Sequence, residues 1–204
     1  MQQLAFNLQR VICSDETGGS FVEKVGNDEI WLSGFGIDAT GATVKLDPFE
    51  IFANFDDGEV KEFPSTTLFT LNVPNEGTFP KTCTVGLLLA ERADGAGHSV
   101  ATEQAFAKAN EMIALQSPKP DGGLSVVTAA VAAAIQEEVK NWVMGIIDSG
   151  LNDNVFPVQT ASLDVSSPDF FWGDGTKLSP ETTVEFRGHD GLYHLVYFWE
   201  MRTV

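Results

Sequence analysis

Carboxylate side chains are the residues whose type and spacing point most directly to chemistry in this sequence. They recur in or beside segments with turn composition. Carboxylates held close together repel one another, and a cation relieves that repulsion. Ca²⁺ binds oxygen ligands and accepts flexible loops as their source. The candidate calcium ligands are Asp15, Glu16, Asp28, Asp56, Asp57, Glu91 and Asp94.

The same carboxylates have a second interpretation. The chain of 204 residues has 29 acidic and 12 basic side chains, for a net charge of -17. Aspartate is also common in turns because its side chain bonds its own backbone. An acidic chain therefore places carboxylates on many loops without any ion, and both interpretations stay open.

Three adjacent aromatic residues, Phe170, Phe171 and Trp172, follow Pro168-Asp169 in a segment with loop composition. Apolar side chains on a loop can anchor a partner. They can also fold back and close the end of a hydrophobic core. We therefore name these three residues as a candidate partner-binding patch, with core closure as the alternative.

Catalytic signatures do not occur. The sequence has no Gly-x-Ser-x-Gly, no phosphate-binding P-loop, no His-Glu-x-x-His and no EF-hand loop. His189 and Asp190 could form a base and the group that orients it, but adjacent residues of a turn rarely point at the same place. Cys13 and Cys83 show no metal-binding spacing, and we expect free thiols, with a single disulfide as the alternative. We therefore expect a protein that is not an enzyme.

The charge balance also bounds the partners. A net charge of -17 repels phosphate backbones, so we expect no nucleic acid as partner. No apolar run approaches the length of a membrane span, so we expect no integral membrane segment. The first residues lack the layout of a signal peptide, which fits a cytoplasmic protein or one exported without a leader, and the compartment stays open.

The elements that must position these residues are mainly strands. Alternating apolar residues between turn signals predict eight strands. They lie at about 3–13, 29–38, 47–56, 61–73, 81–91, 155–165, 182–187 and 192–202. Short strands separated by turns are typical of a sandwich. We expect one antiparallel β-sandwich domain over residues 1–204.

Helical spacing interrupts the strands between the fifth and the sixth. Apolar residues recur at helical intervals from Ser99, a candidate N-cap, to Ser117, and again over about 125–149. The segment 118–123 is short enough to join two antiparallel helices. The sequence therefore predicts a helical insertion at 98–150 that packs against the sheet.

Strand direction then sorts the connections. If every strand reverses the direction of the one before, the connections 14–28, 57–60, 92–154 and 188–191 share one end of the sandwich. The connections 39–46, 74–80 and 166–181 share the other. The first end would gather the candidate calcium ligands.

Eight strands with acidic loops at one end resemble the C2 family of calcium-dependent β-sandwich modules, outside residues 99–150. C2 calcium loops usually carry Asp-x-Asp pairs, whereas this chain has Asp56-Asp57 and Asn152-Asp153-Asn154, so the family's ligands do not transfer residue by residue. Residues 11–17 and 27–32 are also similar to bacterial proteins of unassigned function.

The resemblance implies a binding or assembly module in which Ca²⁺ orders the acidic loops and presents them to a protein or carbohydrate partner. The alternative is a structural or protein-interaction component, an accessory or inhibitor of a basic partner, with no metal.

Overall fold

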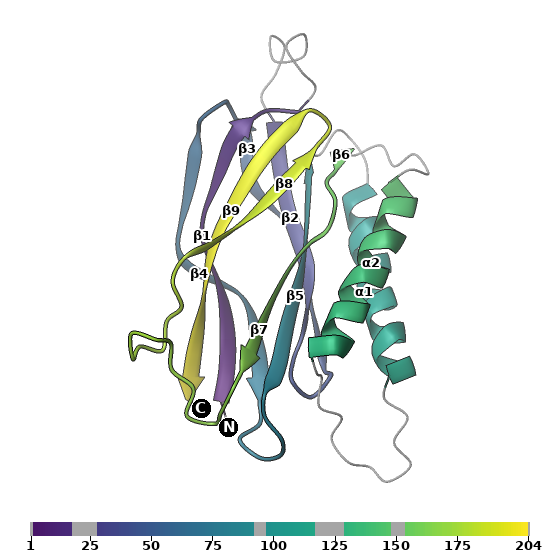
Figure 1. Cartoon of the computed structure of the whole chain (residues 1–204). Helices are drawn as coiled ribbons and strands as arrows, with labels where there is room; N and C mark the ends of the chain where they lie inside the picture. The colour runs from purple at the N-terminus through teal and green to yellow at the C-terminus, as the bar shows by residue number, and fades with distance from the viewer. Residues whose placement is uncertain (1, 18–27, 92–96, 117–128, 148–153, 204) are drawn as a thin grey trace.

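The computed structural model describes most of the chain as a mainly β fold of two antiparallel sheets and two helices. The described residues are 2–17, 28–91, 97–116, 129–147 and 154–203. The sheets face each other, and the helices lie on the outer face of one of them (Figure 1).

The first sheet has four strands in the order β4-β1-β9-β8, and all neighbours are antiparallel. Its strands are β1 (Gln2–Asp15), β4 (Val60–Val73), β8 (Thr182–Gly188) and β9 (Gly191–Thr203). Strand β9 alternates as its sequence predicts, because Tyr193 and Leu195 are fully buried.

The second sheet has the order β3-β2-β5, and both β6 and β7 pair with β5. Its strands are β2 (Asp28–Ile37), β3 (Thr43–Phe55), β5 (Lys81–Glu91), β6 (Asn154–Val155) and β7 (Gln159–Val165). Strand β5 is buried at every residue but the last, and residues 85–90 of the strand are an unbroken run without polar side chains.

Both faces of the second sheet are covered. One faces the first sheet across the main core, in which Phe6, Phe55 and Tyr193 are among the largest fully buried side chains. The other packs against helix α1 (Gly97–Gln116) and helix α2 (Ala129–Ile147) through a second apolar cluster. The fold therefore has two cores that share β2 and β5.

The two helices run in opposite directions along the sheet. In α1, His98 bonds Ser33 of β2, and Asn110 further along bonds Thr43 at the start of β3. In α2, Ala129 lies beside Thr82, near the start of β5. Neither helix has the apolar length that a membrane-spanning helix needs.

The described residues correct several predicted boundaries. The count of eight strands is wrong, because the structure describes nine labelled strands in this part of the chain. The strand expected at 155–165 is divided into β6 and β7 around Pro157, which has no N–H for a ladder hydrogen bond.

The helices of the insertion also differ from their predicted bounds. Helix α1 begins at Gly97, so Ser99 lies inside the helix and is not its N-cap. The predicted residues 125–128 and 148–149 of the second helix lie outside the described residues. In the described residues, the insertion follows β5 and precedes β6.

Candidate functional site

In the described residues, the β3–β4 and β8–β9 turns meet at the end of the sandwich where β1 finishes and β2 starts. Gly58 N donates to Cys13 O at 2.9 Å, and Cys13 N donates to Glu59 O at 3.0 Å, which joins the β3–β4 turn to β1. A Cβ added to Gly191 would lie 2.8 Å from Thr17 Cγ2, so the β8–β9 turn contacts the same place. The alternating strand directions predicted this convergence.

The structure brings most of the candidate calcium ligands to this end, which we call the acidic end. It is formed by Glu16, Thr17, Asp28, Asp56, Asp57 and Glu91. Asp15 precedes them at the end of β1 and is exposed. Asp94 lies outside the described residues.

Thr17 is the centre of the hydrogen bonds at the acidic end. Its N donates to Asp28 Oδ2 at 2.7 Å, and Tyr193 OH donates to the same carboxylate oxygen. Thr17 Oγ1 lies 3.0 Å from Asp28 Oδ1 and 2.5 Å from Glu91 Oε2. Asn154 Nδ2 also donates to Glu91, at 2.6 Å.

The Thr17 hydroxyl lies between two carboxyl groups, those of Asp28 and Glu91. A hydroxyl donates a single hydrogen, so Thr17 Oγ1 donates to one of the two carboxyl groups at a time. Burial raises the pKa of Asp28, against the bonds from Thr17 and Tyr193 that lower it.

Glu16 is the most perturbed carboxyl at this end. Its residue is 4% exposed, and its N donates to Asp57 Oδ1 at 3.0 Å. Burial, the bond with Asp56 and the nearby charges, Asp28 among them, together raise the pKa of Glu16 to about 7. Glu16 therefore changes its charge near neutral pH.

Within the described part of the chain, no three His, Cys, Asp or Glu side chains form a group that could hold a metal ion. There, Asp28 and Glu91 bond to Thr17, Tyr193 and Asn154. The sequence offered no signal for Thr17 or Tyr193, because neither is acidic and they lie far apart in the chain.

The aromatic residues 170–172 are found at the other end and divide into two groups. Phe170 and Trp172 pack against the main core, with ring centroids 4.9 Å apart in an edge-to-face arrangement. Phe171 is 50% exposed. Core closure therefore describes Phe170 and Trp172, and Phe171 alone of the three presents a largely exposed ring.

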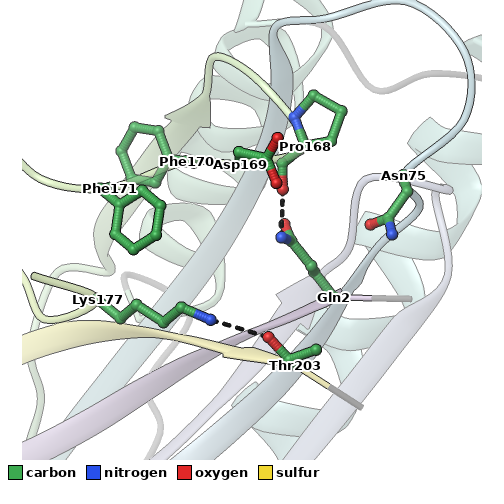
Figure 2. A pocket seen from close by; sticks show the side chains of 8 residues that line it. All are labelled: Gln2, Asn75, Pro168, Asp169, Phe170, Phe171, Lys177 and Thr203. Carbon is green, nitrogen blue, oxygen red and sulfur yellow. Dashed lines mark hydrogen bonds between the residues drawn. The ribbon is translucent and has the colours of Figure 1, made fainter.

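A pocket of about 230 Å³ lies beside Phe171 (Figure 2). Its lining comes from the start of β1, the end of β9, and the connections after β4 and β7. The lining residues are Gln2, Asn75, Pro168, Asp169, Phe170, Phe171, Lys177 and Thr203. We call this the aromatic pocket.

The hydrogen bonds of the aromatic pocket leave one buried acceptor open. Gln2 Nε2 donates to Pro168 O, and Lys177 Nζ donates to Thr203 Oγ1 at 2.8 Å. Gln2 Oε1 is buried and is the one buried side-chain nitrogen or oxygen in the described residues without a hydrogen-bond partner. Such a group is uncommon in folded proteins, because its desolvation is costly.

The loop that carries Phe171 is tied to the sheet. Met201 N donates to Lys177 O and Ser179 N donates to Trp199 O, both at 2.8 Å, so residues 177–179 pair along β9. Trp172 N donates to Thr176 O at 3.0 Å within the loop. The pocket wall is therefore held before any ligand arrives.

Sequence reasoning missed most of the pocket. Gln2 and Thr203 belong to strands that begin and end at this end of the sandwich, and the strand directions alone could have grouped them with the 166–181 connection. Strand directions also group the connection 74–80, which contains Asn75, with the connection that contains Lys177, but they do not predict that these two side chains line one pocket, because that depends on the paths of two loops.

The histidines have structural contacts. His189 lies in the β8–β9 turn at φ 52° and donates from Nε2 to Val155 O at 3.0 Å. His98 Nε2 and Thr102 Oγ1 each lie 2.7 Å from Ser33 Oγ, between α1 and β2, and all three residues are buried. These contacts hold the β8–β9 turn against β6 and helix α1 against β2.

The cysteines are both buried and free. Cys13 belongs to β1 and Cys83 to β5, and burial raises the pKa of each thiol to about 12. The disulfide alternative is therefore wrong, and both thiols are protonated at neutral pH.

Comparison with known proteins gives no matching family model and no curated protein with significant similarity to the chain. The C2 resemblance therefore stays a prediction.

Proposed function

We propose that this chain is a non-enzymatic binding or assembly module whose contact surface is the aromatic pocket. The observation that carries the proposal is the half-exposed ring of Phe171, which lines a pocket of about 230 Å³ together with polar and charged side chains such as Asn75 and Lys177. An exposed apolar side chain alone is ordinary on a protein surface. The pocket beside it is the feature that supports a ligand.

A ligand in the pocket would cover the Phe171 ring and remove its apolar surface from water. Because the loop is paired along β9, little ordering is needed on binding.

Peptide and glycan arrays probed with labelled protein test this proposal. We expect the protein to bind at least one array ligand, and Phe171→Ser to abolish that binding. Leu115→Ser is the matched control, because Leu115 is 66% exposed on α1, away from the pocket. Binding that survives in Phe171→Ser, or the absence of any array ligand, contradicts the proposal.

Calcium binding at the acidic end is the second candidate function. It is supported by Glu16, whose buried carboxyl lies among Asp28, Asp56 and Asp57 and has a raised pKa. A bound cation would relieve the electrostatic repulsion between these carboxylates. The ligands proposed from the sequence are Asp15, Glu16, Asp28, Asp56, Asp57, Glu91 and Asp94.

Thermal unfolding with calcium and with chelator tests this candidate. A ligand that binds only the folded state raises the unfolding midpoint as its concentration increases. Equal midpoints in 5 mM calcium, about a standard saturating concentration for weak loop sites, and in chelator would exclude it. A metal-free interaction module would then remain.

A further inference from the structure

Strand β8 lies at one edge of the first sheet. In the described residues it pairs with β9 alone, and its seven residues keep an unbroken register with that strand (Figure 1). An edge strand presents backbone N–H and C=O groups on its open side, and these can pair with a strand of another chain. Thr182, Thr183 and Val184 are β-branched, and such residues favour strands. Strand β8 is therefore suited to accept a further strand.

The other edge strands differ from β8. Strands β3 and β4 contain Pro48 and Pro64, and the register of their pairing with β2 and β1 shifts at more than one point, as it does at bulges. Proline and bulges keep the edge of a sheet from pairing with another sheet. Strand β7 carries Asp164 as its one charged residue, so a second copy of β7 would bring only a like charge. Strand β8 has no proline and no register shift.

Two exposed side chains of β8 carry opposite charges on the same face. Glu185 and Arg187 are two residues apart, so both point to the outer face of the sheet, where Arg187 Nε donates to Glu185 Oε1 at 3.1 Å. The side chain of Glu185 is 50% exposed and that of Arg187 is 67% exposed, whereas Phe186 between them is fully buried. Opposite charges that flank a central residue make a strand complementary to an antiparallel copy of itself.

Charge selects one register for such a pair. The outer faces of two copies continue into one sheet only when the two-fold axis passes through a residue, because side chains alternate between the faces. An axis at Glu185 or at Arg187 would place that residue opposite its own copy, with like charges together. An axis at Val184 would place Glu185 opposite Thr183. An axis at Phe186 places Glu185 opposite Arg187 of the second copy, and does so twice.

The outer face of the first sheet also has an unusual charge balance for this chain. Between the two ends of the sheet, it carries three arginines and four glutamates: Arg10, Arg187, Arg202, Glu62, Glu181, Glu185 and Glu200. These charges nearly cancel, so almost all of the net charge of -17 belongs to the rest of the chain. Two copies repel each other least where such a balanced face borders the contact.

From these observations we propose that two copies of the chain pair through β8, antiparallel and with the two-fold axis at Phe186, so that the first sheet continues from one copy into the other. Strand β8 contributes no residue to the lining of the aromatic pocket, so this inference does not depend on the proposed function. One short strand pair buries less than the roughly 1,200–2,000 Å² of a standard interface. We therefore expect a reversible dimer with a dissociation constant on the order of 100 μM.

Sedimentation equilibrium of the whole chain from about 10 μM to about 1 mM, a range that brackets this constant, measures the dimer. Arg187→Glu places like charges opposite each other at both contacts and should weaken the dimer about tenfold or more. Lys140→Glu is the matched control, because it makes the same change of charge at an exposed residue of α2. We expect the control to leave the dissociation constant within about twofold of the parent value.

A mixture of two variants tests the register itself. Glu185→Arg alone should weaken the dimer as Arg187→Glu does, because all four facing charges are then alike. In an equimolar mixture of the two variants, each facing pair again has opposite charges. We expect a mixed dimer with a dissociation constant within about threefold of the parent value. Both side chains are at least half exposed, so each variant should keep the unfolding midpoint of the parent protein.

A dimer that Arg187→Glu weakens and that the mixture restores supports the proposal. A chain that stays monomeric up to about 1 mM, tenfold above the expected constant, overturns it. A dimer that Arg187→Glu weakens no more than Lys140→Glu does, or that the mixture fails to restore, also overturns it. Binding of array ligands through Phe171 is a separate result, and it stands or fails independently of these outcomes.

Discussion

Glu16 gives the chain a stability that depends on pH in a direction unusual for a carboxyl. Its pKa is about 7 in the folded protein, against an ordinary value of 4.5. Between these two values the folded state holds more protons than the unfolded state. The free energy of unfolding therefore falls as pH rises from about 4.5 to about 7, and this contribution is flat above and below.

The size of the effect follows from the difference between the two pKa values. At pH 8 the free energy of unfolding is lower than at low pH by roughly 3 kcal/mol, since one pKa unit is worth about 1.4 kcal/mol. Glu16→Gln keeps the shape and offers an amide donor to Asp56, but it carries no charge at any pH. We expect the variant to exceed the stability of the parent protein by less than about 1 kcal/mol at pH 5 and by about 2–3 kcal/mol at pH 8.

Urea unfolding at pH 5, 6, 7 and 8 measures this difference. Asp15→Asn is the matched control, because it removes the same charge from the neighbouring residue, which is exposed. We expect the control to change stability by no more than about 0.5 kcal/mol at any of these pH values. A Glu16→Gln curve parallel to that of the parent, or one that lies below it at pH 8, would refute the reasoning.

Two further predictions concern buried positions of the second sheet, Gly86 and Ser33, and each is paired with a comparison variant elsewhere. Gly86→Ala should destabilise the fold by about 1–3 kcal/mol in urea unfolding, because its Cβ would lie 2.3 Å from Cζ of the buried Phe35 ring. Gly145→Ala in α2, where an added Cβ meets no atom within 4 Å, should instead stabilise by about 0.5–1 kcal/mol, and equal effects of the two variants would contradict this account. Ser33→Ala should cost about 1–3 kcal/mol, because His98 and Thr102 lose a hydrogen bond in a buried place. Ser14→Ala, which removes an exposed contact to His194, should cost less than about 0.5 kcal/mol, so a loss as large as that of Ser33→Ala would argue against burial as the cause.

The strands were largely readable from the sequence because alternation and turn residues are local signals. The strand expected at 81–91 has the same bounds as β5, and the last strand buries Tyr193 and Leu195 as its pattern predicts. The strand expected at 155–165 was wrong because Pro157 interrupts the ladder, and that signal was present in the sequence.

The candidate sites were less readable, because their contacts are not local. Counting strand directions predicted which connections share the acidic end, since antiparallel order fixes it. It did not predict that Thr17 and Tyr193 bond the Asp28 carboxylate, because those bonds depend on side-chain positions across the core. The sequence left two alternatives for the aromatic residues, partner binding and closure of the core. In the structure, the path of the loop packs Phe170 and Trp172 against the core and leaves Phe171 exposed.

The most direct test of the proposed contact surface is a map of amide chemical shifts for whichever array ligand the protein binds. The proposal predicts shifts that cluster at Gln2, Asn75, Phe171 and Lys177, around the aromatic pocket. Shifts that cluster instead at Thr17, Asp57 and Gly191, at the acidic end, would contradict it.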